Sequence, residues 1–287
     1  MIHAYQIDWN ADAMPTIKSD SWEGVYAGLG FAHAWNHPNL TLIALLRAQG
    51  RAAEFLGRHS GPGPSSITKQ PDGVDYLQSD RLAWQLDIAR LGEQYWQQQD
   101  ESMRARLLAW CDGVNECLRT HPERFDERLR GVGPVTVQML MAHVAHILLG
   151  FQIMLRQPTL VAWMQGAQPV APSWQSFVGA GSNACVVGPS KSLEGHPMLV
   201  CNPHTQWDVD LNTFMECRLE VGQNFAMQGA GMVGWPGLMM GCNAHTGFAA
   251  TVNTQSSLTF YQLTLQGDRF EVDTEPHLMQ QVRRELR

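Results

Sequence analysis

The stretches GSNAC at residues 181–185 and NPHTQW at residues 202–207 decide how this 287-residue chain is interpreted. The first follows a loop of small and polar residues, 165–181, and leads into an apolar run at 184–187 that is typical of a buried strand. Cleavage of the Gly181–Ser182 bond would give Ser182 a free α-amine with an ordinary pKa of about 7.7–8.0, which can activate its own hydroxyl near neutral pH. The stretch therefore predicts a nucleophile and its base on one residue at the start of a strand.

Composition argues against several classes of partner. The formal net charge is −7 and no cluster of Lys and Arg is visible, so a nucleic-acid partner is not expected. The longest apolar run, 135–155, is interrupted by polar residues and does not predict a membrane span. The six cysteines form neither a CxxC pair nor a disulfide framework, and we expect buried free thiols, Cys185 included.

The order of predicted elements is helices first and strands second, which indicates an α+β fold. After a first strand at 2–8, apolar periodicity and capping residues predict helices at about 21–36, 38–56, 78–99, 100–119 and 136–156. Strands are predicted at 183–188, 197–202, 213–221, 224–230, 238–242, 247–253 and 258–265.

Five stretches together resemble the N-terminal-nucleophile (Ntn) hydrolases of the penicillin acylase superfamily. His204 follows Ser182 by 22 residues (204 − 182), and Trp207 comes shortly after it. The other stretches are the helix pair GLGFAHAWN…AAEFLG within 28–57, GWPGL at 234–238 and TVNT at 251–254, where Ala250 replaces the family's histidine. The chain is most similar to the branch with acyl-homoserine-lactone, aculeacin and cephalosporin acylases.

This resemblance implies a fold and a division of the chain. The family fold is an αββα sandwich, of which this chain would hold a part. Residues 1–164 correspond to the helical α-subunit region, 165–181 to a spacer ending at the cleavage site, and 182–287 to the first part of the β-subunit core. Family β-subunits continue much further, so we expect a fragment of a longer product, one piece of a split assembly or a degenerate relative.

The resemblance also implies roles for individual residues. Ser182 would be the nucleophile, released by self-cleavage after Gly181, and His204 would orient it and tune its basicity. The backbone N–H of Val252 maps to one oxyanion donor, whereas the second family donor, an asparagine, would lie beyond residue 287. Trp207, Trp235 and Met232 are candidates for an acyl pocket, although Met and Trp side chains of this kind are more often plain core.

No metal or other cofactor is expected. His143 and His146 lie one helical turn apart but lack a nearby carboxylate or cysteine in the sequence, so packed helix histidines are favoured over a metal pair. Some relatives bind calcium through acidic residues after the TVNT-like segment, where this chain has QSSL at 255–258.

The predicted function is hydrolysis of a linear acyl amide: an N-acyl homoserine lactone, a lipopeptide or a β-lactam, with the first two favoured by the branch. The alternative is a non-catalytic fragment that lacks the second oxyanion donor and needs another chain, such as a separate C-terminal segment. Relatives are usually exported, which implies a periplasmic or extracellular location, yet no signal peptide is visible before the first predicted strand. Either a leader was removed or the chain differs from its relatives.

Overall fold

The computed structural model describes residues 3–59, 74–164, 181–204, 213–251, 261 and 263–283, and for 151–164 it describes the backbone alone. The α-helices are α1 (Trp22–Asn36), α2 (Pro38–Gln49), α3 (Ala52–Leu56), α4 (Tyr76–Gln85), α5 (Ile88–Gln97), α6 (Glu101–Thr120) and α7 (Val137–Met164). Short 3-10 helices are η1 (Pro122–Arg124), η2 (Glu127–Leu129) and η4 (Pro189–Lys191). The strands are β1 (Gln6–Trp9), β2 (Pro15–Ser19), β3 (Ser182–Val187), β4 (Met198–Pro203), β5 (Phe214–Val221), β6 (Phe225–Met232), β7 (Met240–Cys242), β8 (Gly247–Phe248), β9 (Leu265–Gln266), β10 (Arg269–Val272) and β11 (Glu275–Leu278).

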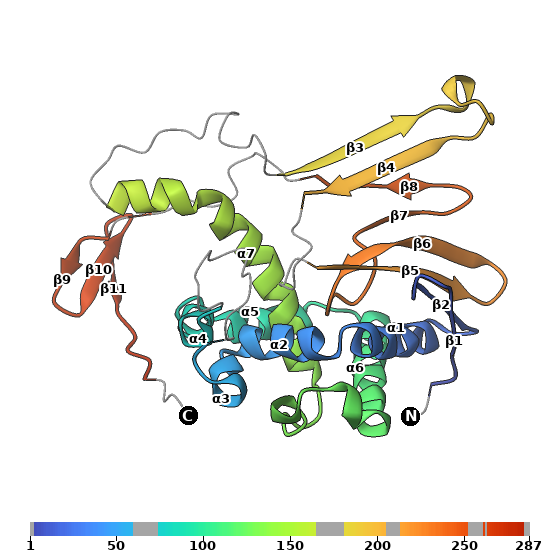
Figure 1. The fold of residues 1–287 in the computed structure, drawn as a ribbon. Coiled ribbons are helices and arrows are strands. Elements are labelled where there is room, and N and C mark those ends of the chain that lie inside the picture. The colour runs from blue at the N-terminus through green and yellow to red at the C-terminus, as the bar shows by residue number, and fades with distance from the viewer. Residues whose placement is uncertain are drawn as a thin grey trace.

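A six-stranded sheet with the order β1-β2-β5-β6-β7-β8 lies against the helices (Figure 1). All neighbouring strands in it are antiparallel except β2 and β5, which are parallel. Alternate side chains of β5, namely Met215, Cys217 and Leu219, are buried in the core that the helices share. One face of this sheet is thus covered by helices, as in an α+β fold.

The predicted order of a helical N-terminal part followed by antiparallel strands is confirmed. The strand predicted over 2–8 begins only at Gln6 in the structure, as β1, and β2 was not predicted at all. β2 pairs with β5 about 200 residues later in the chain, so nothing in its local sequence reports that pairing. The β10–β11 hairpin was not predicted either. Its turn residues Asp273 and Thr274 adopt positive φ angles, and an Asp-Thr pair is not among the glycine-containing pairs that signal a tight hairpin turn in a sequence.

Two of the predicted helices, 38–56 and 78–99, are each divided in two. The helix predicted over 38–56 ends at Gln49, because Gly50 adopts a left-handed conformation with φ of 65° and packs directly against the Trp84 ring. The helix predicted over 78–99 is interrupted at Asp87, which has φ of 51°. The helix starts predicted near residues 21 and 136 are confirmed: the hydroxyl groups of Ser21 and Thr136 each accept a hydrogen bond from the backbone N–H three residues onward.

Helices α1 and α6 pack with their backbones in contact. A Cβ atom at Gly30 would collide with the carbonyl oxygen of Trp110, and one at Gly113 would collide with the carbonyl oxygen of Ala27. Trp110 itself is fully buried. Two glycines on facing helices therefore let α6 approach α1 closely enough to bury this indole beneath the sheet.

The apolar run at 184–187 is not the buried strand that the sequence indicates. Residues 184–186 are exposed, Val186 to 71%, and Cys185 lies on the surface and not in the core. The reason is that β3 and β4 form a separate two-stranded sheet beyond β8, and the helical core does not reach it (Figure 1). Of the other five cysteines, all free, Cys111, Cys117 and Cys217 are buried as expected, Cys201 is half-buried and Cys242 is exposed.

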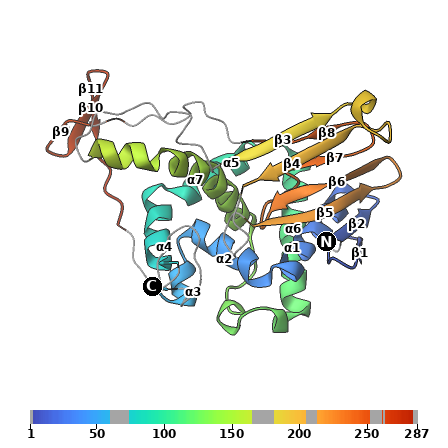
Figure 2. The ribbon, with the colours of Figure 1, turned by 45° about the horizontal axis from the view of Figure 1, so that its top comes forward.

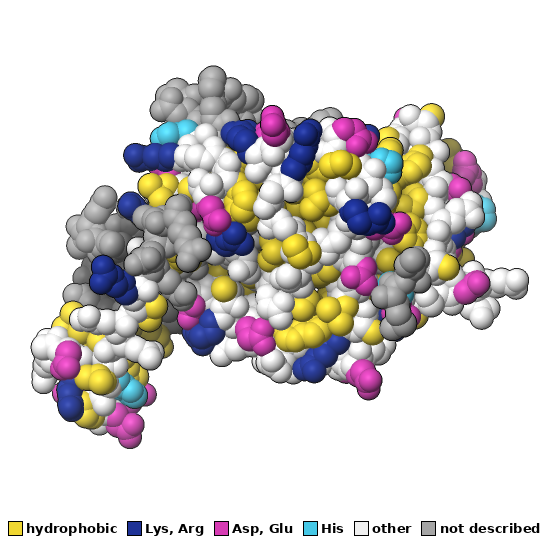
Figure 3. All heavy atoms as spheres, turned by 90° about the horizontal axis from the view of Figure 1, so that it is seen from below, with side chains coloured by type: hydrophobic (Ala, Val, Ile, Leu, Met, Phe, Trp, Pro, Cys, Tyr) yellow, Lys and Arg dark blue, Asp and Glu magenta, His cyan; other side chains and the backbone are white. Residues whose placement is uncertain are grey.

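The helical side of the molecule carries a mixed surface. Seen from below, Lys, Arg, Asp and Glu side chains are interspersed among hydrophobic ones, so neither sign of charge dominates this face (Figure 3). Within the described ranges, none of the helices combines the length and the apolar character that a membrane crossing requires.

Substitution of the contact glycines tests the α1–α6 packing. We expect Gly30→Ala and Gly113→Ala each to lower the free energy of unfolding by about 1–3 kcal/mol, because the added methyl group forces the helices apart. Urea unfolding followed by circular dichroism measures this change. Gly150→Ala in α7 is the matched control: a Cβ there meets no atom within 4 Å, and alanine should raise stability by about 0.5–1 kcal/mol. Equal effects at all three sites would contradict the packing argument.

Candidate active site

Antiparallel pairing of β3 with β4 assembles the predicted nucleophile and the predicted histidine. Ser182 lies opposite Pro203 and Asn183 lies opposite Asn202 in the register of the two strands. Ser182 is the first residue of β3, as predicted, and His204 directly follows the last residue of β4. Two residues that are 22 apart in the chain are therefore neighbours across one strand pair.

The peptide bond that self-cleavage would break is held by His204. The backbone N–H of His204 donates to the carbonyl oxygen of Gly181 at 2.9 Å. Gly181 has φ of 131°, a conformation that residues with side chains rarely adopt. A glycine before Ser182 thus lets the chain turn into β3 while its carbonyl group stays bonded to β4, and the hydrogen bond polarises that carbonyl group.

The His204 imidazole is oriented by Asn183. The Asn183 amide nitrogen lies 3.0 Å from Nε2 of His204. Because an amide nitrogen can only donate, Nε2 is the acceptor, and the neutral ring carries its proton on Nδ1. The sequence interpretation assigned no role to Asn183, although it stands beside Ser182. Its role follows from the strand register, which sets it diagonally across from His204.

Two predicted pocket residues lie at the same end of the molecule as this strand pair. Met232 is the last residue of β6 and is buried, and Trp235 is half-buried in the turn that follows. The end of β6, the start of β3 and the end of β4 point to one end of the sheets in both views (Figures 1 and 2). Trp207 and Val252 lie outside the described residues, so their predicted roles stay predictions.

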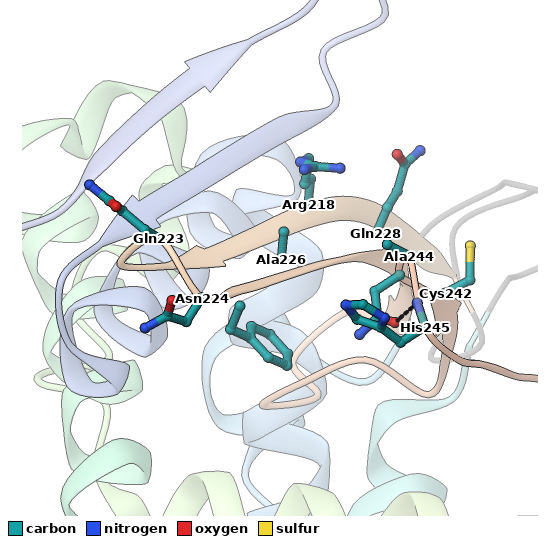
Figure 4. Close-up of a pocket in the computed structure, with 10 residues that line it drawn as sticks. Arg218, Gln223, Asn224, Ala226, Gln228, Cys242, Ala244 and His245 are labelled. Carbon is teal, nitrogen blue, oxygen red and sulfur yellow. Dashed lines mark hydrogen bonds between the residues drawn. The ribbon is translucent and has the colours of Figure 1, made fainter.

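A separate hollow lies at the opposite end of the sheet. Its volume is about 420 Å³, and it is bordered by the β5–β6 and β7–β8 turns together with side chains of the open sheet face (Figure 4). Arg218 in this hollow is paired with Glu220, and His245 donates its backbone N–H to Asn243. Of the predicted site residues that the structure describes, none borders it. This hollow on the open face is therefore distinct from the candidate site.

The described residues hold no group of three His, Cys, Asp or Glu side chains placed to bind a metal ion. His143 is fully buried on α7, and its Nε2 lies 3.1 Å from the Val233 carbonyl oxygen. That contact explains His143 as a packed helix histidine. His146, one turn further, is half-buried, and burial lowers its pKa to about 3.

Comparison with known families identifies the chain. A family model described as penicillin amidase matches residues 4–287, nearly the whole sequence. The chain belongs to the penicillin amidase family. The matched region includes the strand pair described above.

Several curated proteins with similar sequences are named as acylases. The chain is similar to acyl-homoserine lactone acylase PvdQ of Pseudomonas fluorescens, with 25% identity over 88% of this chain and 33% of that protein. PvdQ of Pseudomonas putida is 27% identical over 91% of this chain and 34% of that protein. Aculeacin-A acylase of Actinoplanes utahensis is 25% identical over 93% of this chain and 36% of that protein. The chain thus spans about a third of the length of these relatives.

A solved structure also matches. A thermostable penicillin G acylase from Alcaligenes faecalis superposes with a TM-score of 0.39 and 18% identity, covering 55% of this chain and 85% of that one.

Loss of the Asn183 side chain tests how the His204 ring is held. In Asn183→Ala we expect the Nδ1-protonated form of His204 to lose its preference, because Nε2 no longer receives a hydrogen bond. Two-dimensional ¹H–¹⁵N spectra of the imidazole nitrogens distinguish the two tautomers. Asn202→Ala, across the strand pair, is the control and should leave the tautomer unchanged. A wild-type ring protonated mainly on Nε2 would contradict the assignment.

Proposed function

We propose that this chain carries the nucleophile of an acylase that hydrolyses linear acyl amides, with Ser182 acting after self-cleavage of the Gly181–Ser182 bond. The observation that supports the proposal is that His204 contacts Gly181, at the carbonyl end of that bond, and Asn183, the residue after Ser182. Its backbone N–H binds the Gly181 carbonyl oxygen, and its ring binds Asn183. Membership in the penicillin amidase family is consistent with an amide as substrate.

In the proposed self-cleavage the Ser182 hydroxyl oxygen attacks the Gly181 carbonyl carbon. The C–N bond breaks, an ester joins Gly181 to the Ser182 oxygen, and the nitrogen takes up the proton that the hydroxyl group loses and becomes the free α-amine of Ser182. Water then hydrolyses the ester to a Gly181 carboxylate and the Ser182 hydroxyl, so one water is consumed. The His204 N–H already bonded to the carbonyl oxygen would stabilise the negative charge that develops on it.

In the proposed amide hydrolysis the new α-amine accepts the proton of the Ser182 hydroxyl, and the oxygen attacks the substrate carbonyl carbon. The amine product leaves with a proton, and water hydrolyses the acyl–Ser182 ester to a carboxylate. His204 would orient the α-amine, with its own ring held by Asn183. The Val252 N–H is the expected oxyanion donor in this step.

The proposed substrate has an apolar acyl chain joined by an amide to a polar head group, such as an N-acyl homoserine lactone or a lipopeptide. Two of the similar relatives are named for these kinds of substrate, acyl-homoserine lactone acylase and aculeacin-A acylase. Met232 and Trp235, together with Trp207, are the proposed acyl-contacting side chains. We place the activity in the periplasm or outside the cell, where the family is usually found.

A second candidate function is that of a non-catalytic part which needs another polypeptide. One observation favours it: β3, which carries Ser182, exposes residues 184–186. A further segment supplying strands and the second oxyanion donor would complete such a site. Loss of one oxyanion donor typically costs about 10²–10³ in rate.

Intact-mass spectrometry of the purified 32.0 kDa chain tests the self-cleavage. We expect two fragments, residues 1–181 and 182–287, because the His204 N–H polarises the carbonyl group that precedes Ser182. Ser182→Ala should stay unbroken, whereas Ser192→Ala, in the same hairpin, should cleave like the wild type. An unbroken wild-type chain after prolonged incubation would refute self-cleavage by this chain alone.

The role of the His204 ring is tested separately by hydrolysis of an N-acyl homoserine lactone. His204→Ala keeps the backbone N–H on Gly181 but removes the imidazole, so cleavage at Gly181 should persist while acyl-amide hydrolysis falls by about 10²–10⁴. Mass spectrometry follows the first reaction, and release of free homoserine lactone follows the second. A cleaved wild-type chain that hydrolyses no acyl amide would favour the second candidate function.

A further inference from the structure

The turn between β6 and β7 is buried where most turns are exposed. Residues 232–234 are buried, and Gly234 adopts φ of 81°. The backbone N–H of Val233 donates to Thr213, and that of Trp235 donates to Met232, both at 2.9 Å. The Val233–Gly234 peptide group still has a carbonyl oxygen and an N–H that need partners away from water.

Two histidines from different helices bind the two ends of this single peptide group. His33 on α1 accepts the Gly234 N–H through Nδ1 at 3.2 Å, and Nε2 of His143 on α7 lies 3.1 Å from the Val233 carbonyl oxygen. A carbonyl oxygen only accepts, so His143 donates from Nε2, while His33 carries its proton on the opposite nitrogen. Both side chains are buried, with 1% and 0% exposure.

Only glycine fits at the centre of this arrangement. A Cβ atom at Gly234 would lie 2.7 Å from Nε2 of His143, and the positive φ angle is itself unfavourable for other residues. The backbone of the turn at Gly234 therefore lies so close to the His143 ring that no side chain fits between them.

We propose that His33 and His143 are positioning residues, which clamp the Val233–Gly234 peptide and thereby hold Met232 and Trp235 in place at the site end of the sheet. The two hydrogen bonds of the clamp exist whether or not the protein is a catalyst. Only the further step, that the clamp shapes an acyl pocket, rests on the proposed function. Through it, the helical N-terminal part sets the position of a wall that belongs to the strand part.

The charge states of the two histidines agree with this role. Burial, with smaller effects from His37 and His143, lowers the pKa of His33 to about 3, and burial, with Arg47 nearby, lowers the pKa of His143 to about 4. Protonation of His33 would place a hydrogen on Nδ1, which could then no longer accept the hydrogen bond from the Gly234 N–H. The Trp110 ring also faces His33 and adds no charge.

The sign of the pH effect follows from these values. Both pKa values lie below the ordinary 6.5, so the clamped state binds fewer protons than an opened state in which the rings meet water. The clamp is at full strength above pH 6.5 and weakens as the pH falls towards 4. For each histidine, opening becomes about tenfold more favourable between pH 7.5 and pH 5.5.

Amide hydrogen exchange of residues 232–239, corrected for the chemical exchange rate at each pH, tests the proposal. We expect the opening equilibrium of the wild type to rise by about 100-fold between pH 7.5 and pH 5.5. His143→Gln keeps a donor at the same position but does not titrate, so the rise should fall to about tenfold. The double variant His33→Asn/His143→Gln should keep the protection and lose the pH dependence. Peptides from α6 serve as the internal reference for global opening.

Apolar substitutions provide the second arm. His33→Leu leaves the Gly234 N–H without its acceptor, and we expect exchange in 232–239 to rise at least tenfold at pH 7.5, with His33→Asn restoring protection. Exchange in this turn that is unchanged in His33→Leu would overturn the proposal. If His33→Leu fails to fold, the pH series decides, and equal pH dependence in the wild type and the double variant overturns the clamp.

An activity measurement separates the clamp from the acyl pocket. With an N-acyl homoserine lactone as substrate, His33→Leu should raise KM about tenfold or more with a smaller change in kcat, and His33→Asn should restore KM. An unchanged KM despite faster exchange overturns the link to the pocket. Absence of hydrolysis in the wild type refutes the proposed function, while the exchange measurements still decide the clamp.

Discussion

The hydrogen bonds between β3 and β4 hold the candidate site together, because they bring His204 to the peptide bond that precedes Ser182. The register sets Ser182 opposite Pro203, and the next backbone N–H, that of His204, reaches the Gly181 carbonyl oxygen. A shift of one residue in this pairing would move every side chain of the hairpin to the other face. It would also separate Asn183 from the His204 ring. The geometry thus depends on one local ladder of backbone bonds.

The β3–β4 strand pair lies outside the main core, so the candidate site is not supported by buried core residues on the side of β3. Buried residues are concentrated in the helices and in β5, whereas β3 is largely exposed. A two-stranded hairpin alone is marginally stable in water, so further contacts are needed to fix it. One visible contact is with β8, where the Cys201 thiol reaches the Phe248 carbonyl oxygen at 3.9 Å. The proposed need for another polypeptide follows naturally from this exposure.

The turn after β6 connects the two parts of the molecule more firmly. His33 and His143 are 110 positions apart in the chain (143 − 33) and lie on different helices, yet they bind the same peptide group. Sequence reasoning treated His143 as a packed helix histidine and passed over His33. No spacing rule could have paired them, because their common partner is a backbone group of a distant turn. Only the closely packed arrangement of α1, α6 and α7 brings them together.

The sequence by itself determined the family, the α+β order, the start of β3 at Ser182 and most strand positions, since these depend on local motifs and hydrophobic periodicity. It could not predict the breaks at Gly50 and Asp87, because both residue types also occur within continuous helices. It predicted a buried strand at 184–187 because the run is apolar. This prediction was wrong, since an apolar run does not show whether another layer of the fold covers it. Tertiary structure alone decided the parallel pairing of β2 with β5, the bond between Asn183 and His204, and the histidine clamp. All three join groups through space whose partners are set by packing and not by nearby sequence.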